Sequence, residues 1–153
     1  MADLARLLDP EAIFDPLSAD CRQQTLLALS SALGARTGLD ERSIFEAVME
    51  RERLGSTGVG DGVAIPHVRL PGLLKSVGAF ARLETPCDFE AVDDRPCDLV
   101  FMLLAPETEG GDHLRALALV ARTLRDPDLR MALRKGKPGA RELLLGLKHG
   151  AAA

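Results

Sequence analysis

Apolar residues recur at helical spacing in the first third of the chain. The leucines Leu26, Leu29 and Leu33 predict a helix over 18–33, and Gly34 and Gly38 are stop signals. A second helix is expected over 40–54 with Asp40 as its N-cap, and its apolar stripe consists of Ile44, Phe45 and Val48. Both segments therefore present one apolar face for packing.

Apolar runs of strand length follow these helices. Val63, Ala64 and Ile65 form a short run that Pro66 stops, and a longer run spans 76–83. The segment 98–105 (DLVFMLLA) is almost continuously apolar, which is typical of a central strand covered on both faces.

Helix signals return in the last third of the chain. Asp112 is expected to cap a third helix, whose apolar face consists of Leu114, Leu117, Ala121 and Leu124. Asp126 and Pro127 begin a fourth helix that ends by Gly136, and a short helix is expected over 138–147. Helices before, between and after strands predict an α/β sandwich, a single domain with a mixed β-sheet flanked by helices, and leave the strand order open.

Length and composition narrow the class of protein. The 153 residues suit one domain over 1–153, with a core of about 4–147 and a tail over 148–153. The net charge of −4 argues against nucleic acid as a partner, and the three cysteines match no metal-ligand spacing. Because no leader or membrane-spanning run is visible, we expect a cytoplasmic protein with reduced thiols and no direct membrane insertion.

The most informative segment is the glycine-rich stretch GSTGVGDG at 55–62, which precedes His67. Its glycines permit tight turns and can aim backbone N–H groups at an anion, and a neutral imidazole is a competent nucleophile for phosphoryl transfer. The alternative is that His67 only caps a strand and that the glycines only make a turn. A nucleotide-binding P-loop is excluded because no GK[ST] ending follows, and Ser56 lacks the G-x-S-x-G context of a hydrolase nucleophile.

The segment RERLGSTGVGDGVAIPH, residues 51–67, resembles the phosphorylation-site signature of the fructose/mannitol-type enzyme IIA family. This family belongs to the bacterial phosphoenolpyruvate-dependent phosphotransferase system. The resemblance extends from the helix at Ser18 to the final helix and is strongest over 50–67. A chain of this length with a GSTG-type loop most resembles the nitrogen-regulatory branch of the family.

The resemblance implies roles for four residues and a donor. His67 would accept a phosphoryl group from a histidine phosphocarrier protein of the HPr or NPr type, and Arg51 would hold that group by charge-assisted hydrogen bonds. The hydroxyl of Thr57 would donate to it, and His113 would orient the imidazole or the phosphate. Neither a cofactor nor a metal is implied. A solvated Arg51, a turn hydroxyl at Thr57 and a surface His113 remain open alternatives.

Three functions stay compatible with these residues. The favoured one is a phosphotransferase component that acts mainly as a nitrogen-related regulatory switch, because phosphohistidine adds negative charge at a docking surface. Its target would be a kinase, a transporter or a transcriptional regulator. A sugar-specific IIA component would instead pass the phosphoryl group to a separate IIB domain, and a non-catalytic docking module would regulate by binding alone.

Two further expectations concern the surroundings of His67. The family usually has a small residue where this chain has Val68, and the β-branched side chain is expected to narrow partner access. A mildly apolar docking surface is expected from Val59, Val63, Val68 and Leu70, although the same residues suit a core equally well. His149, near the chain end, is expected to be solvated and without function.

Overall fold

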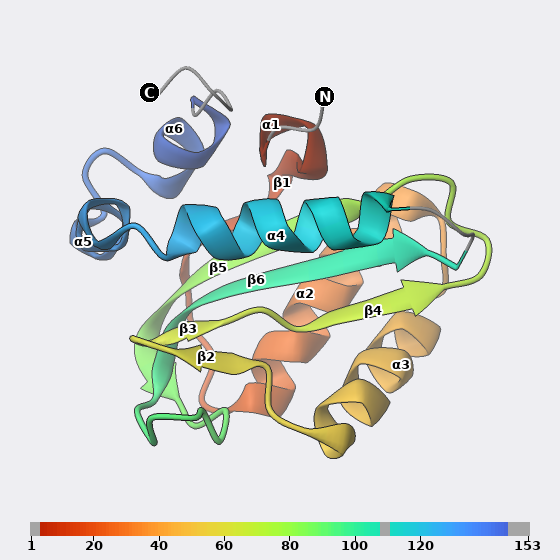
Figure 1. The fold of residues 1–153 in the computed structure, drawn as a ribbon, viewed down its shortest axis with the longest axis horizontal. Coiled ribbons are helices and arrows are strands. Elements are labelled where there is room, and N and C mark those ends of the chain that lie inside the picture. Colours follow the sequence, from red (N-terminus) through yellow and green to blue (C-terminus); the bar gives the residue numbers. More distant parts are fainter. Residues whose placement is uncertain (1–3, 108–110, 147–153) are drawn as a thin grey trace.

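The computed structural model describes residues 4–107 and 111–146, which form a six-stranded mixed sheet with helices on both faces (Figure 1). The strands are β1 (Leu8–Leu17), β2 (Gly58–Gly60), β3 (Val63–Ala64), β4 (His67–Leu70), β5 (Val77–Cys87) and β6 (Cys97–Pro106). Their order is β1-β5-β6-β3-β2, and β4 also pairs with β6. β5 runs antiparallel to β6, whereas β3 and β4 run parallel to it.

The helices divide between the two faces of the sheet. They are α1 (Leu4–Leu7), α2 (Arg22–Thr37), α3 (Glu41–Leu54), α4 (Asp112–Leu124), α5 (Pro127–Lys135) and α6 (Ala140–Leu145). One apolar core joins α2 and α3 to the sheet, and a second joins α1, α4, α5 and α6 to the opposite face. Figure 1 shows α4 across one face and α2 behind the other.

The predicted α/β class and the longer predicted elements are confirmed. Every residue of β6 except Asp98 is buried, as expected for a strand covered on both faces. Asp40 and Asp126 cap α3 and α5 by accepting hydrogen bonds from backbone N–H groups. The end of α2 differs from the prediction: Gly34 lies inside the helix against Glu41, and Gly38 with φ 81° ends it.

The apolar pattern predicts no strands over 8–17, 58–60 or 67–70, yet all three segments pair in the sheet. β1 contains Pro10 and Pro16, which an edge strand tolerates because one row of its backbone groups is unpaired. The short strand β2 forms a hairpin with β3 through Asp61 and Gly62, whose φ angles of 58° and 78° suit a type I′ turn. The Asp-Gly pair is the sequence signal for that hairpin.

Two predictions concern residues near the end of the chain that lie outside the described residues. These are the tail over 148–153 and the solvated His149. The final helix, expected over 138–147, is observed as Ala140–Leu145 and begins after Gly139.

Candidate functional site

His67 is the first residue of β4, directly after the short strand β3 and the Ile65-Pro66 connection. β4 pairs in parallel with β6, and His67 lies opposite Leu103. Successive side chains of a strand point to opposite faces. Val68 and Leu70 pack into the core beneath α2 and α3, so His67 and Arg69 share the opposite face, where α4 lies.

His113, the second residue of α4, lies beside His67. The two ring centroids are 6.1 Å apart and the ring planes are inclined by 39°. Both side chains are half-buried. Burial lowers the pKa of His113 below its ordinary value of 6.5, and the nearby His67 and Arg69 lower it further. The structure therefore brings together two predicted site residues that are 46 positions apart in the sequence.

A backbone carbonyl orients the His67 ring. Its Nδ1 lies 2.7 Å from the carbonyl oxygen of Ile65. A carbonyl oxygen can only accept a hydrogen bond, so Nδ1 carries the proton in the neutral ring. Nε2 then holds the lone pair, which is the form that a nucleophile requires.

Arg51 and Thr57 are placed differently from the two histidines. Arg51 lies in the last turn of α3, and its Nη1 donates to the carbonyl oxygen of Gly55 at 2.9 Å. Thr57 is only 3% exposed, and its hydroxyl donates to Oε2 of Glu52. Among the described residues, no hydrogen bond, ion pair or ring contact joins Arg51 or Thr57 to either imidazole.

The glycine-rich segment builds the hairpin and packs closely against the loop after β5. A Cβ at Gly58 would lie 2.7 Å from the Cβ of Ala91, so only glycine fits there. Three N–H groups of the segment are satisfied within the chain: Gly55 donates to Glu52, Gly58 to Ser56 and Asp61 to Asp93. The N–H groups of Gly55 and Gly58 therefore bind neutral groups of the chain, and that of Asp61 binds a carboxylate of the chain, rather than a bound phosphoryl group.

Two residues of the site, Arg69 and Glu52, are not among those that the sequence analysis singled out. Arg69 is exposed on the same strand face as His67, and the alternation of β4 predicts this once the strand is known. Glu52 is buried on α3 in line with Ile44 and Val48, so continuation of that apolar stripe by one turn identifies it as facing the core.

The apolar surroundings only partly match the expectation. Val59 is 56% exposed, whereas Val63 and Leu70 are buried in the two cores. The side chain of Val68 is half-buried against the α2 and α3 core, on the opposite face of β4 from His67. Strand alternation directs the Val68 side chain away from the face of His67, which argues against the expectation that it adds bulk where a partner approaches.

Two exposed leucines occur instead at the end of the sheet where α4 begins. Leu114 follows His113 in α4 and is 67% exposed. Leu74 is 97% exposed in the turn after β4, and β4 and β6 end together at Leu70 and Pro106. The turn after β4 and the start of α4 thus occur at the same end of the sheet (Figure 1).

The buried cysteines lie on β5 and β6, apart from the two histidines. Buried Cys87 and Cys97 are partners across β5 and β6, and burial raises both thiol pKa values, that of Cys97 to about 12. Within 4–107 and 111–146, no group of three or more His, Cys, Asp or Glu residues suits a metal ion. No helix in that part of the chain is long and apolar enough to cross a membrane.

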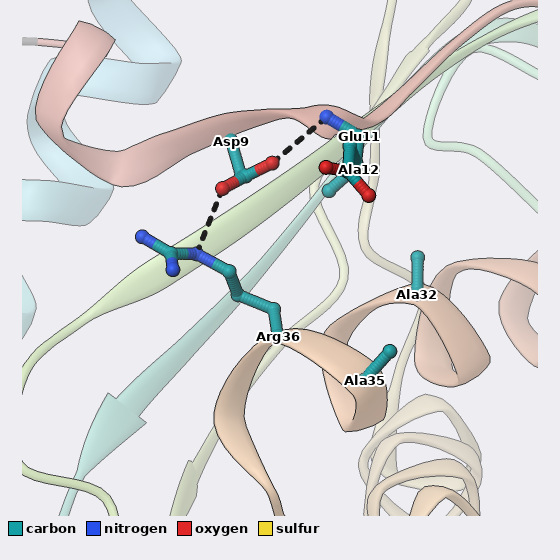
Figure 2. Close-up of a pocket in the computed structure, with 6 residues that line it drawn as sticks. All are labelled: Asp9, Glu11, Ala12, Ala32, Ala35 and Arg36. Carbon is teal, nitrogen blue, oxygen red and sulfur yellow. Dashed lines mark hydrogen bonds and ion pairs between the residues drawn. The ribbon is translucent and has the colours of Figure 1, made fainter.

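A surface hollow of about 280 Å³ separates β1 from α2 (Figure 2). Asp9 lines it and pairs with Arg36 at 3.2 Å, and its other carboxylate oxygen accepts from the backbone N–H of Glu11. Three alanines complete the lining: Ala12, Ala32 and Ala35. The hollow contains none of the predicted site residues, and two of its three charged side chains, Asp9 and Arg36, are paired with each other.

Comparison with known proteins gives consistent results. A family model described as "Phosphoenolpyruvate-dependent sugar phosphotransferase system, EIIA 2" matches residues 6–143. The nitrogen regulatory protein of Bradyrhizobium diazoefficiens is 51% identical over 131 residues, which is 86% of each chain. The crystal structure of nitrogen regulatory protein IIA-Ntr from Neisseria meningitidis is similar with a TM-score of 0.81 and 34% identity, covering 86% of this chain and 90% of that chain.

A more distant structure shares the fold. The mannitol enzyme IIA of Escherichia coli, solved in complex with phosphorylated enzyme IIB, has a TM-score of 0.73 at 22% identity. The similarity covers 92% of this chain and all of that chain (100%). The mixed sheet and its flanking helices are therefore common to regulatory and sugar-specific proteins.

Proposed function

Because the chain belongs to the EIIA type 2 family of the phosphoenolpyruvate-dependent sugar phosphotransferase system, we propose that His67 carries a phosphoryl group and that its phosphorylation state regulates a partner. The donor is a histidine phosphocarrier protein. The target is a protein such as a kinase, a transporter or a transcriptional regulator, and the exchange takes place in the cytoplasm. The regulatory assignment is supported by the similarity to nitrogen regulatory proteins.

The observation that carries the proposal is the orientation of the His67 ring. Its Nδ1 proton is held by the Ile65 carbonyl at 2.7 Å, which leaves Nε2 as the attacking atom. In the transfer, the P–N bond to the donor imidazole breaks while a P–N bond to Nε2 forms. The electron pair of the broken bond stays on the donor nitrogen, and the Nδ1 proton of His67 stays in place.

Cationic and polar groups near His67 are proposed to stabilise the transferring phosphoryl group. Phosphoryl transfer depends mainly on positioning and on positive charge around the equatorial oxygens. Arg69 shares the strand face of His67, and Arg51 has N–H groups beyond the one that donates to Gly55. His113 has a buried Nδ1 without a hydrogen-bond partner among the described residues, which suits a role in orienting the imidazole or the phosphate.

Thr57 is proposed to act differently from the role that the resemblance implies. Its hydroxyl donates to the buried carboxylate of Glu52, so direct donation to a phosphoryl group would first require breaking that hydrogen bond. Because the hydroxyl of Thr57 is bonded to Glu52, we propose that Thr57 contributes to phosphoryl transfer indirectly, through the position of its own backbone.

Intact-protein mass spectrometry at neutral to basic pH tests the carrier function. The chain is incubated with phosphoenolpyruvate, enzyme I and a histidine phosphocarrier protein, next to His67→Ala and His113→Ala variants. We expect a gain of one phosphoryl mass that is labile to acid, absent in His67→Ala and slower to appear in His113→Ala. No gain, or an equal gain in His67→Ala, would overturn the proposal and favour a docking module.

The regulatory role and the sugar-specific alternative differ in the acceptor. The mannitol enzyme IIA that shares this fold was solved with phosphorylated IIB. A IIB domain is therefore the acceptor of the phosphoryl group to test against a regulated target. Phosphorylated protein is therefore offered to purified IIB domains. We expect no efficient transfer, whereas rapid transfer followed by sugar phosphorylation would favour the transport role.

A further inference from the structure

Glu52 is a carboxylate buried at the end of α3, where only 6% of the residue is exposed. Burial of a charged group costs free energy unless it is paired and hydrogen-bonded. Its Oε1 lies 3.5 Å from Nη1 of Arg22 and has no hydrogen-bond partner among the described residues. Its Oε2 accepts the hydroxyl proton of Thr57.

A series of hydrogen bonds leads from this carboxylate to the imidazole. The carbonyl oxygen of Thr57 accepts from the backbone N–H of Ile65 at 2.9 Å. The carbonyl oxygen of Ile65 in turn lies 2.7 Å from Nδ1 of His67. The side chain of Glu52 is thus connected to His67 through Thr57 and Ile65, which flank the hairpin of β2 and β3.

We propose that Glu52 is a positioning residue for His67 and that it acts through Thr57, an inference that rests on the proposed phosphocarrier function. The carboxylate holds the Thr57 side chain and thereby its backbone. The Thr57 carbonyl fixes Ile65, and the Ile65 carbonyl fixes both the rotation of the His67 ring and the Nδ1-protonated tautomer. Nε2 then faces the donor before the partner arrives.

The charge of Glu52 is balanced separately from this series. Arg22 approaches the other carboxylate oxygen and also donates to the exposed carboxylate of Glu90 at 3.0 Å. Removal of the Thr57 hydroxyl therefore leaves the ion pair intact and interrupts only the connection to the hairpin. Glu90→Gln provides a matched carboxylate-to-amide control on the same arginine, outside the series.

The first measurement is ¹⁵N NMR of the His67 ring in unphosphorylated Thr57→Val, Thr57→Ser, Glu52→Gln and Glu90→Gln proteins. A protonated and an unprotonated ring nitrogen have distinct chemical shifts, so the spectrum reports the tautomer directly. We expect Thr57→Val to populate the Nε2-protonated form, Glu52→Gln to do so to a smaller extent, and Thr57→Ser and Glu90→Gln to match the wild type.

The second measurement is the rate of phosphoryl transfer from the histidine phosphocarrier protein. We expect kcat to fall about tenfold in Thr57→Val with KM for the carrier unchanged, because misplacement of a reacting group affects the reaction more than the docking. Circular dichroism establishes that each variant is folded. If Thr57→Val does not fold, Glu52→Gln decides the question by the same spectrum.

A wild-type tautomer and rate in both Thr57→Val and Glu52→Gln would overturn the inference. This outcome is distinct from failure of the proposed function, which would appear as absent phosphorylation in the wild type. The tautomer is read without any phosphoryl donor, so it tests the positioning role in either case.

Discussion

His113 shows how one residue is tuned by its surroundings. Desolvation, then His67 and Arg69, lower its pKa below 6.5. Between the lowered native pKa and the ordinary value, the unfolded chain binds more protons than the native protein. The free energy of unfolding therefore decreases as the pH falls through this window, and the neutral ring is the native form above it.

Replacement of His113 by Gln should flatten that pH dependence. We expect the loss of unfolding free energy between about pH 7 and about pH 5 to be smaller in His113→Gln than in the wild type. Urea titrations at each pH, followed by circular dichroism, measure the difference. As a check on the cause, Arg69→Gln should raise the pKa of His113 in an NMR titration, whereas Arg42→Gln, an exposed site on α3, should not.

Val68 makes a second prediction at the scale of one side chain. Its side chain packs against the α2 and α3 core, on the opposite face of β4 from His67. We expect Val68→Gly to lower the free energy of unfolding by about 1–2 kcal/mol, because the strand loses a half-buried side chain and gains backbone entropy when unfolded. The phosphoryl exchange rate should stay within about twofold of the wild type, since the reacting face of β4 is unchanged.

Thermal and urea unfolding measure the first effect, and phosphoryl exchange with the histidine phosphocarrier protein measures the second. Val68→Thr, which keeps a β-branched shape, is the control. A markedly faster exchange in Val68→Gly would show that the valine does obstruct the partner.

The hairpin of β2 and β3 depends on close backbone packing. Alanine at Gly58 would place its Cβ 2.7 Å from the Cβ and 2.9 Å from the Cα of Ala91. We expect Gly58→Ala to cost about 1–3 kcal/mol of unfolding free energy, because the backbone of Ala91 must shift. Gly139→Ala is the matched control: its nearest atom would be the Asp15 carboxylate oxygen at 3.4 Å, which is an ordinary van der Waals contact.

Thr57 directly precedes this hairpin, so a shift of Gly58 should also reach the site. In Gly58→Ala, the rate of His67 phosphorylation is expected to decrease although no site residue is changed. Unfolding and phosphorylation are measured on the same preparations. Equal stability of Gly58→Ala and Gly139→Ala would refute the steric argument.

Predictability from sequence differs among the elements for a physical reason. The periodic helices and the apolar β6 are predicted because their burial follows from their own side chains. β1, β2 and β4 are not, since β2 and β4 are short and the apolar residues of β1 are interrupted by acidic residues and prolines. The pairing of β1 and β4 is decided by strands that lie far away in the sequence, β5 for β1 and β6 for β4, whereas β2 pairs with the adjacent β3.

At the scale of the whole molecule, β6 unites two cores. Phe101 belongs to the core beneath α4, and the adjacent Met102 belongs to the core beneath α2 and α3. We expect Phe101→Ala and Met102→Ala each to cost about 2–5 kcal/mol. Each variant should still unfold in one single transition, at lower stability than the wild type, because neither face of the sheet is stable without the shared strand.

Circular dichroism at several wavelengths is the appropriate measurement, since the chain has no Trp or Tyr for intrinsic fluorescence. Leu74→Ala, at a side chain that is 97% exposed, should change the stability little. Two separate transitions in either core variant would contradict a single cooperative unit.

Local sequence sufficed to single out His67 and to predict most helices. His67 stands in a segment whose residues and order carry the resemblance to the enzyme IIA family, and helix caps such as Asp40 and Asp126 act on neighbouring N–H groups. These features depend on residues a few positions apart, so the linear pattern contains them.

Tertiary structure alone decided which groups surround His67. The pairing of β4 with β6 places His67 beneath α4, where His113 lies beside it, and turns Val68 inward. The packing of α3 buries Glu52 at the start of a hydrogen-bonded series that ends at the imidazole. Such contacts join residues from different elements, and the sheet register that sets them arises from the packing of two cores. A pattern read along one chain does not contain that register, because it is fixed by pairing between distant segments.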